Sequence, residues 1–263
     1  MSYWIDRLAS NQLNLSDKTV KAINKQLINY YGRAMERVIK DFEAVYNKIM
    51  ATVEEGKTPT PADLYKLDKY WEAQAQMRRE LQRLGDKEKQ ILSKVFETHF
   101  FEIYYSIDIP NGEAAFNTID TEVVQQLING IWVADGKQWS QRVWENTERL
   151  AQTLNEELIH IVTTGKKETD LKKALVERFD VSYHRAQTLV RTEVAHIQTE
   201  AAKKRYQDYG IQYVEVLTAH RGGGEDTKTC PICKALEGKK FPVGGVMPLP
   251  AHPNERCCLV PVV

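Results

Sequence analysis

The stretch from Ser16 to Glu55 constrains the fold most, because its apolar residues recur in steps of 3, 4 and 4 positions. An 11-residue period of this kind keeps a single stripe on one side of a nearly straight, slightly right-handed helix. The stretch has no proline and one glycine, Gly32, and Ser16 is a residue type that commonly caps helix N-termini. We therefore predict one helix over residues 16–55, about 60 Å long. Its stripe comprises Val20, Ile23, Leu27, Tyr31, Ala34, Val38, Phe42, Val45, Ile49 and Val53.

A helix with one narrow apolar stripe needs partner helices to cover it. Gly85 separates two of the further helical patterns, Ser140 and Ser182 are expected N-caps, and Gly210 is expected to end the last helix. The stripe is longer than we expect the chain itself to cover evenly, so it also predicts a contact with other proteins. The further helical patterns cover residues 62–84, 86–105, 119–127, 140–163, 169–179 and 182–209, with a turn at 109–112.

Beyond Gly210 the period changes from helical to alternating, which indicates strands. Residues 212–219 have the pattern of a strand, and a glycine-rich loop follows at 221–226. Two further short strands are expected at 238–243 and 259–263. The pattern therefore predicts a helical body that carries a small β-rich tail.

All four cysteines lie between Cys230 and Cys258. Cys230 and Cys233 form a Cys-x2-Cys knuckle, His252 follows from a second short segment, and a further cysteine, Cys257, comes shortly after it. Thiolate and imidazole groups from two short loops are typical ligands of a four-coordinate structural zinc. Such an ion stabilises a segment too small to build its own core. The absence of cysteine from the whole chain before Cys230 argues against a disulfide framework and for a reducing compartment.

Two alternatives compete with a structural Zn²⁺. The segment from Cys230 to Cys233 also has the pattern of a glutaredoxin-like redox site. Such motifs come near the start of a βα unit, with most of the sheet still to follow, whereas Cys233 is followed by a short segment rich in proline and glycine. The second alternative is two pairs of inert thiols in a small β-rich tail. The metal-ligand spacing favours zinc over both.

No constellation of catalytic residues stands out. Glu193 and His196 share a helix face, as in carboxylate-bridged di-iron sites, but such a site needs a second Glu-x-x-His helix and two further carboxylates, and we expect no second copy. We expect a charged helix surface there, with an ion pair between Arg191 and Glu193. A nuclease of the His-Asn-His type is a fairer alternative, since it can combine a zinc knuckle with a catalytic histidine. Its ββα unit requires a helix after that histidine, and His252 is followed by Pro253 and an extended end.

Charge is balanced, with 36 basic and 36 acidic side chains. No global field therefore recruits nucleic acid or an acidic membrane surface. No apolar run approaches the roughly 20 residues that span a bilayer, and the N-terminus lacks the pattern of a secretion signal. We expect a soluble protein made in a cytoplasm, which contacts no membrane and contacts DNA weakly at most.

Several segments together match one protein family. The matching segments are Ala186, Leu189 to Glu193, Tyr206 to Gly210, Cys230 and Cys233, Gly238 to Phe241, and Pro250 to Asn254. With them, residues 140–260 resemble the Mu F-like head-morphogenesis proteins, which are minor capsid proteins of tailed bacteriophages. The usual ending of this family is His-Pro-Asn-Cys-Arg-Cys. Here Glu255 stands at the first of those cysteines and Cys257 at the last, so the resemblance makes Cys257 the expected fourth zinc ligand, with Cys258 as an adjacent thiol that could substitute.

The resemblance implies a structural function. Members of the family are built into the procapsid in low copy number, commonly at the portal vertex, and some are thought to leave the head with the DNA. We therefore expect a non-enzymatic minor capsid protein of the phage virion, made in the host bacterial cytoplasm. Its expected partners are the portal protein and other capsid or scaffold proteins. The alternative is a zinc-containing His-Asn-His-like nuclease that acts on DNA.

The predicted fold class is mainly α, an elongated helical body with a small C-terminal α+β part that ends in a zinc-stapled β tail. We place the domain boundary between residues 137 and 138. Residues 1–137 form the helical N-terminal region, which contains the long helix. Residues 138–263 form the Mu F-like domain, which contains the knuckle and the expected zinc ligands Cys230, Cys233, His252 and Cys257.

Overall fold

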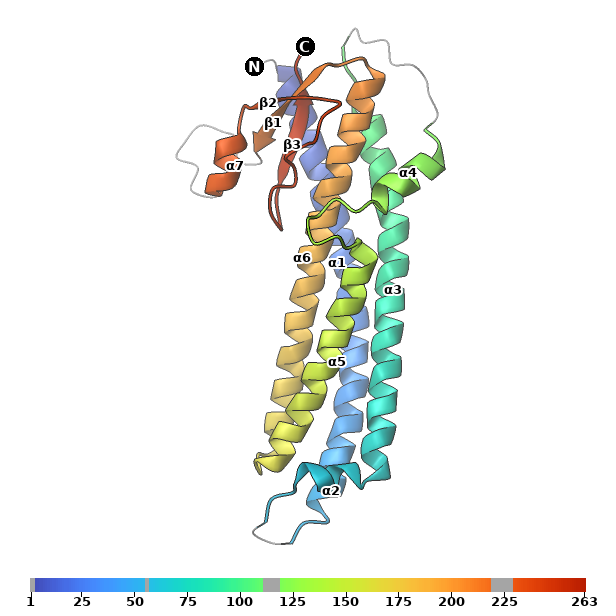
Figure 1. Cartoon of the computed structure of the whole chain (residues 1–263), viewed down its shortest axis with the longest axis vertical. Coiled ribbons are helices and arrows are strands. Elements are labelled where there is room, and N and C mark those ends of the chain that lie inside the picture. Colours follow the sequence, from blue (N-terminus) through green and yellow to red (C-terminus); the bar gives the residue numbers. More distant parts are fainter. Residues whose placement is uncertain (1–2, 55–56, 111–118, 219–228) are drawn as a thin grey trace. The chain divides into compact units, whose positions relative to one another are not determined.

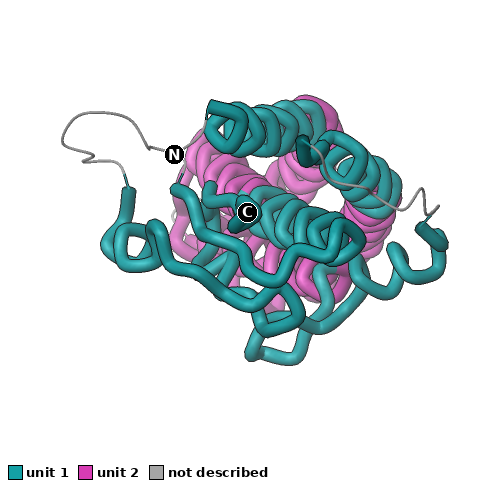
Figure 2. Tube along the Cα trace, turned by 90° about the horizontal axis from the view of Figure 1, so that it is seen from above, with its two compact units in different colours: residues 1–23, 91–139, 188–263 teal, residues 24–90, 140–187 magenta. Residues whose placement is uncertain are grey.

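The computed structural model describes residues 3–54, 57–110, 119–218 and 229–263. The chain forms two compact units, and each draws on separate stretches of the sequence (Figure 2). Unit 1 comprises Met1–Ile23, Ile91–Trp139 and Thr188–Val263, and unit 2 comprises Asn24–Gln90 and Ser140–Gln187.

The chain is mainly α and carries a small antiparallel sheet near its C-terminus, as the sequence predicts (Figure 1). Part of the turn expected at 109–112 and the loop expected at 221–226 lie outside the described residues. In chain order the elements are α1 (Tyr3–Met50), α2 (Pro61–Tyr65), α3 (Asp68–Ser106), α4 (Thr121–Ile128), α5 (Trp139–Thr163), α6 (Glu168–Asp208), β1 (Tyr213–Thr218), α7 (Pro231–Leu236), β2 (Lys240–Pro242) and β3 (Cys257–Pro261).

Unit 2 is a bundle of four long helical segments, supplied by α1, α3, α5 and α6, with the short α2 at one end (Figure 1). The apolar stripe of α1 is buried: Leu27, Phe42 and Val45 are 0% exposed. Of the ten stripe residues, Val53 alone is not fully buried, and it lies beyond the end of α1. Because the chain itself covers the stripe, the expectation that the stripe binds other proteins is wrong.

The predicted start of the first helix at Ser16 is also wrong. Helix α1 begins at Tyr3 and runs through Ser16, because Leu8, Ala9 and Gln12 continue the buried face towards the N-terminus. The Ser16 hydroxyl contacts His99 Nε2 at 3.1 Å and donates to Gln198 Oε1. The serine is therefore an interior hydrogen-bonding group of unit 1 rather than a helix cap.

Two other expected breaks are absent from the described helices. Helix α3 continues through Gly85, where a Cβ atom would come within 2.8 Å of the Trp144 ring. The glycine therefore allows α5 to approach closely. Helix α6 continues through Ser182, which is buried together with Phe179 and Ala186 on one face. Burial of that continuous face overrides the capping tendency of the serine.

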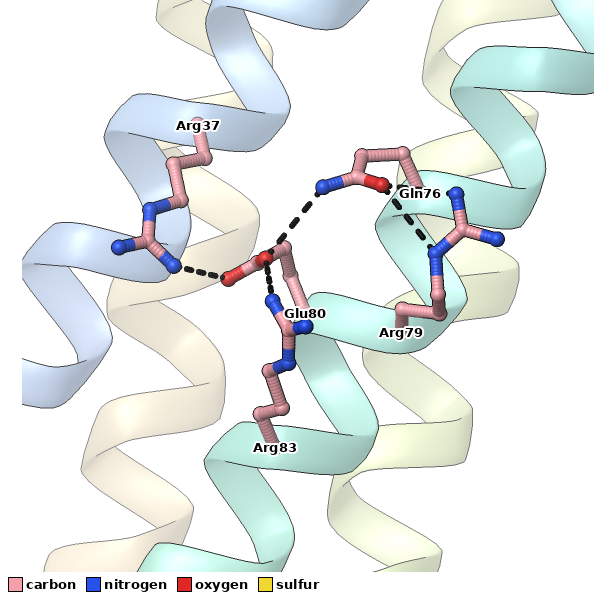
Figure 3. A network of polar contacts seen from close by, with 5 residues as sticks. All are labelled: Arg37, Gln76, Arg79, Glu80 and Arg83. Carbon is pink, nitrogen blue, oxygen red and sulfur yellow. Dashed lines mark hydrogen bonds and ion pairs between the residues drawn. The ribbon is translucent and has the colours of Figure 1, made fainter.

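Glu80 is a buried acid of unit 2 that is neutralised from two helices. It is 4% exposed, and it accepts hydrogen bonds from Arg37 of α1 and Arg83 of α3, both at 2.7 Å. Gln76 adds a longer contact at 3.4 Å (Figure 3). Because both arginines keep much of their surface in water, the network fixes α1 against α3 without burying the cations.

Glu88 is a second buried acid of unit 2, with 1% exposure. The Tyr31 hydroxyl donates to Glu88 Oε2 at 3.1 Å, and Asn146 Nδ2 donates to the Tyr31 hydroxyl at 3.1 Å and to the Ser182 carbonyl at 2.9 Å. Burial raises the pKa of Glu88 to about 7. The carboxyl group is thus close to half-protonated at neutral pH.

Unit 1 holds the sheet, in the strand order β2-β1-β3 with both pairings antiparallel. Helix α6 ends at a left-handed Gly210 (φ +70°), and the Ile211 N–H donates to the Tyr206 carbonyl, as the sequence predicts for a glycine-terminated helix. The buried Tyr206 hydroxyl donates to the Leu259 carbonyl at 2.9 Å, and Gln12 donates to the same carbonyl at 3.1 Å. These bonds attach β3 to α6 and α1. Among the described helices, none combines the length and apolar character that crossing a bilayer requires.

Candidate metal centre

The knuckle is built on the N-terminus of α7. Cys230 is the N-cap, Pro231 occupies the first turn, and the Cys233 N–H donates to Cys230 Sγ at 3.4 Å. Proline suits this position because its fixed φ favours the first turn and it lacks an N–H. The cap therefore turns both sulfur atoms of the Cys-x2-Cys motif to the same side.

His252 reaches this knuckle from a separate loop. Its Nε2 lies 3.1 Å from Cys230 Sγ and 3.1 Å from Cys233 Sγ. Its Nδ1 lies 2.8 Å from the Pro253 carbonyl oxygen, which fixes the tautomer with the proton on Nδ1. Nε2 is then left as a lone-pair donor that faces two sulfur atoms, the usual arrangement of a metal-binding histidine.

Cys257 and Cys258 are the first two residues of β3 and point to opposite faces. Cys258 is 0% exposed and packs with Ala9, Leu217 and Val260 in the core of unit 1. Cys257 lies on the other face, where its sulfur falls within 4.8 Å of donor atoms of Cys233 and Glu255. The alternation of the strand therefore favours Cys257 over Cys258 as the cysteine of the site.

Glu255 is the member of the cluster that sequence reasoning did not count as a donor. Its side chain is buried, at 2% exposure. The Ala251 N–H donates to Oε2, whereas Oε1 is buried without a hydrogen-bond partner among the described residues. Burial raises the pKa of this carboxyl group. An orphaned buried carboxylate oxygen is costly unless a cation or a proton compensates it.

The donors fall into two sets that share Cys233. One set is Cys230, Cys233 and His252, and the other is Cys233, Glu255 and Cys257; within each set all donor atoms lie within 4.8 Å of one another. Thiols, an imidazole and a carboxylate are the ligand types that zinc takes in proteins. The donor set and the orphaned Glu255 oxygen both fit a divalent metal ion.

The thiols differ in how readily they would lose a proton. The Cys233 N–H lowers the pKa of Cys230, whereas burial raises the pKa of Cys233 to about 12. Burial, reinforced by the neighbouring Glu255, raises the pKa of Cys257 as well. Because a bound metal ion stabilises thiolates, the two buried cysteines gain most from a cation at this position.

The Arg-Thr-Glu segment of α6 and the His-Pro-Asn segment of the His252 loop contact each other. Asn254, whose backbone is left-handed at φ 63°, donates through its N–H to the Thr192 hydroxyl at 3.2 Å. Asp17 of α1 accepts from Arg191 at 3.4 Å and also pairs with Arg256. The Arg-Thr-Glu segment of α6 is therefore a docking surface for the loop that carries His252.

The expected charged surface at Glu193 and His196 is wrong, because both side chains are buried, at 1% and 6% exposure. Trp132 stacks on the His196 ring at 4.3 Å between centroids and donates to Glu193 Oε2 at 3.1 Å. The expectation of no second Glu-x-x-His pair is wrong as well, since Glu157 and His160 form one in unit 2. The Glu193–His196 pair therefore supports the packing of Trp132.

Comparison with known families identifies the C-terminal part of the chain. Residues 152–259 match the family model described as Phage Mu protein F like protein. The segment is Mu F-like. The Mu F-like segment contains all five donor residues and the whole of α6, so the predicted family resemblance is confirmed where the motifs lie.

A curated relative is the NAD(+)–arginine ADP-ribosyltransferase EFV of Enterococcus faecalis strain V583, which is 23% identical over 117 residues. The match covers 44% of this chain and 24% of the relative, so the chain spans about a quarter of that protein's length. No solved structure matches the chain. The comparisons therefore place the Mu F-like segment in a family, and they carry no activity over to it.

Proposed function

We propose that the chain is a minor capsid protein of a tailed bacteriophage, which takes part in head morphogenesis and performs no catalysis. The observation that carries the proposal is the Mu F-like match over residues 152–259, within which the Arg-Thr-Glu and His-Pro-Asn motifs contact each other. Motif residues that bind each other fit a role in holding a fold together. We place the chain in the procapsid near the portal. Its proposed partners are the portal protein and other capsid or scaffold proteins, and we propose that it is ejected with the DNA.

We propose further that one structural Zn²⁺ is held by Cys230, Cys233, His252 and Cys257. The convergence of His252 Nε2 on two sulfur atoms supports the first three ligands, and the position of Cys257 on β3 supports the fourth. Zinc at this position would join α7, the His252 loop and β3 in a segment with a small core of its own.

Metal analysis of the purified protein tests the zinc proposal, which predicts about one zinc per chain. Cys230→Ser should lose the metal and make the tail sensitive to protease, because metal binding and folding are coupled in small segments. Cys258→Ser is the matched control, since that thiol lies in the apolar core and should leave the zinc content unchanged. Full zinc retention in Cys230→Ser would remove that residue from the site.

The nuclease alternative lacks support in the described geometry. After His252 the chain continues into β3, whereas a His-Asn-His unit requires a helix there. The relative named as an ADP-ribosyltransferase does not favour a nuclease either. Plasmid cleavage with added divalent metal, compared between wild type and His252→Ala, distinguishes the two functions. Cleavage that the substitution abolishes would favour the enzyme.

Complementation of a phage that lacks the gene tests the structural function. A chain without residues 211–263 should give fewer infectious particles, because the docked tail is lost, and Arg191→Ala should have a milder effect. Glu215→Gln offers a control within the tail, since Glu215 lies on β1 and belongs to neither donor set. Normal infectivity with the truncated chain would contradict a role for the tail in head assembly.

A further inference from the structure

We propose that Glu255 and Cys257 share the fourth coordination position of the metal, so that the site can hold its ion with either donor. The inference rests on the metal site proposed above and adds a ligand to it. The observation behind it is the second donor set, in which Cys233, Glu255 and Cys257 all lie within 4.8 Å of one another.

The first three ligands leave one position open. Cys230, Cys233 and His252 form one compact set, and Cys233 is the member it shares with the second set. A structural zinc site is almost always four-coordinate. One position therefore remains for two candidate donors, the Glu255 carboxylate and the Cys257 thiolate, and both are ligand types that zinc accepts.

The environment of Glu255 favours ligation. Its Oε2 is held by the Ala251 N–H, one residue before His252, which ties the carboxylate to the loop that carries the imidazole ligand. Its Oε1 has no hydrogen-bond partner among the described residues. Within the part of the chain that the structure describes, no lysine or arginine forms an ion pair with Glu255. A buried carboxylate oxygen in this position is stabilised by a cation or a proton, and a metal ion bound at Cys233 would supply the cation.

Charge explains why the two donors alternate instead of binding together. Three thiolates and a neutral imidazole give a zinc complex of net charge −1, and so do two thiolates, one carboxylate and the imidazole. Binding all five donors would bury a second uncompensated negative charge, which is costly in a low-dielectric site. When Glu255 ligates, Cys257 remains a neutral buried thiol, which proteins tolerate well. When Cys257 ligates, Glu255 carries the proton instead, so that the net charge is −1 in both states.

Substitution of the two donors, singly and together, tests the proposal in the full-length protein titrated with Zn²⁺ against a competing chelator. Cys257→Ser should still bind one zinc, with an affinity lowered by roughly 10–100-fold, comparable to the loss of a supporting group. Glu255→Gln should also bind one zinc, since glutamine keeps the shape and the Ala251 contact. The double variant should bind zinc at least tenfold more weakly than the two single losses of affinity, multiplied together, would predict.

Cobalt substitution gives a readout that does not depend on removing a cysteine. In Glu255→Gln, Cys257 should occupy the fourth position all the time, so thiolate-to-cobalt charge-transfer absorption should be stronger than in wild type. The proposal that Glu255 shares the position is overturned if the absorption is unchanged, or if Cys257→Ser binds zinc as weakly as the double variant does. Either result leaves intact the site formed by Cys230, Cys233, His252 and Cys257. A wild-type chain that binds neither zinc nor cobalt overturns the site itself.

Discussion

Glu88 is a buried carboxyl group whose pKa, about 7, lies well above its ordinary value of 4.5. The folded state therefore binds this proton more tightly than the unfolded state does. The resulting stabilisation is complete below about pH 4.5 and is lost as the pH rises towards 7. Tyr31, whose hydroxyl donates to Glu88, is its hydrogen-bonding partner in the bundle.

We predict that Glu88→Gln removes this pH dependence. Between pH 4.5 and 7 the unfolding free energy of wild type, measured relative to the variant, should fall by on the order of 3 kcal/mol. His99, whose pKa burial lowers to about 4, acts in the opposite direction but is present in both proteins and cancels. Urea unfolding across this range measures the difference. Parallel curves for the two proteins would contradict a buried, proton-binding Glu88.

At the metal centre, sequence spacing predicted the cysteines and the histidine but not Glu255. Cys-x2-Cys and a later histidine have a recognisable spacing, whereas a lone carboxylate has none. Only the fold shows that Glu255 is buried beside Cys233 and Cys257. The family resemblance already favoured Cys257 over Cys258, and the alternation of β3, in which Cys257 pairs with Thr218, favours the same cysteine.

Among the helices and strands, the sequence predicted their existence and type better than their ends. The period of α1 and the alternation of β1 were sufficient to predict those elements. The serine and glycine signals at Ser16, Gly85 and Ser182 predicted breaks that do not occur, because tertiary packing outweighs capping preferences worth about 1 kcal/mol. Helix α7 was missed because it is short and its first turn consists of the knuckle itself.

Gly85 and Gly32 provide a matched pair for the packing of α3. Both lie inside helices, but a Cβ atom at Gly32 meets nothing within 4 Å, whereas one at Gly85 comes 2.8 Å from the Trp144 ring. Gly32→Ala should therefore raise the unfolding free energy by about 1 kcal/mol through helix propensity. Gly85→Ala should lower it, because the ring must move. Equal stabilisation by both substitutions, measured by urea unfolding, would contradict the close approach of α5 to Gly85.

Phe42 and Ile28 test whether the stripe of α1 is an internal core. Phe42 is 0% exposed and Ile28 is 53% exposed on the same helix. Phe42→Asp should lower the unfolding free energy of the isolated protein by more than about 3 kcal/mol, since it removes a buried ring and buries a charge. Ile28→Asp should change it by less than about 1 kcal/mol. Thermal unfolding of both variants measures the contrast. If Phe42→Asp is as stable as wild type, the stripe is not buried and is available to bind partner proteins.

Across the whole chain, the Mu F-like motifs lie far apart in sequence and meet in unit 1. Thr192 binds the backbone of Asn254, and Asp17 contacts both Arg191 and Arg256. The sequence shows that both motifs are present in this chain, but only the structure shows that they bind one another. The predicted boundary between residues 137 and 138 stays a prediction, although α5 begins beside it at Trp139.

The central claim is that this chain is a structural component of a phage head. Mass spectrometry of procapsids and virions, purified from a phage whose genome carries the gene, tests the claim most directly. We predict that peptides of the full chain are present in procapsids at a low, fixed ratio to the portal protein, and that the ratio falls when residues 211–263 are deleted. Absence of the chain from both particles would contradict the structural function, most clearly if the pure protein also cleaves DNA in a manner that depends on His252.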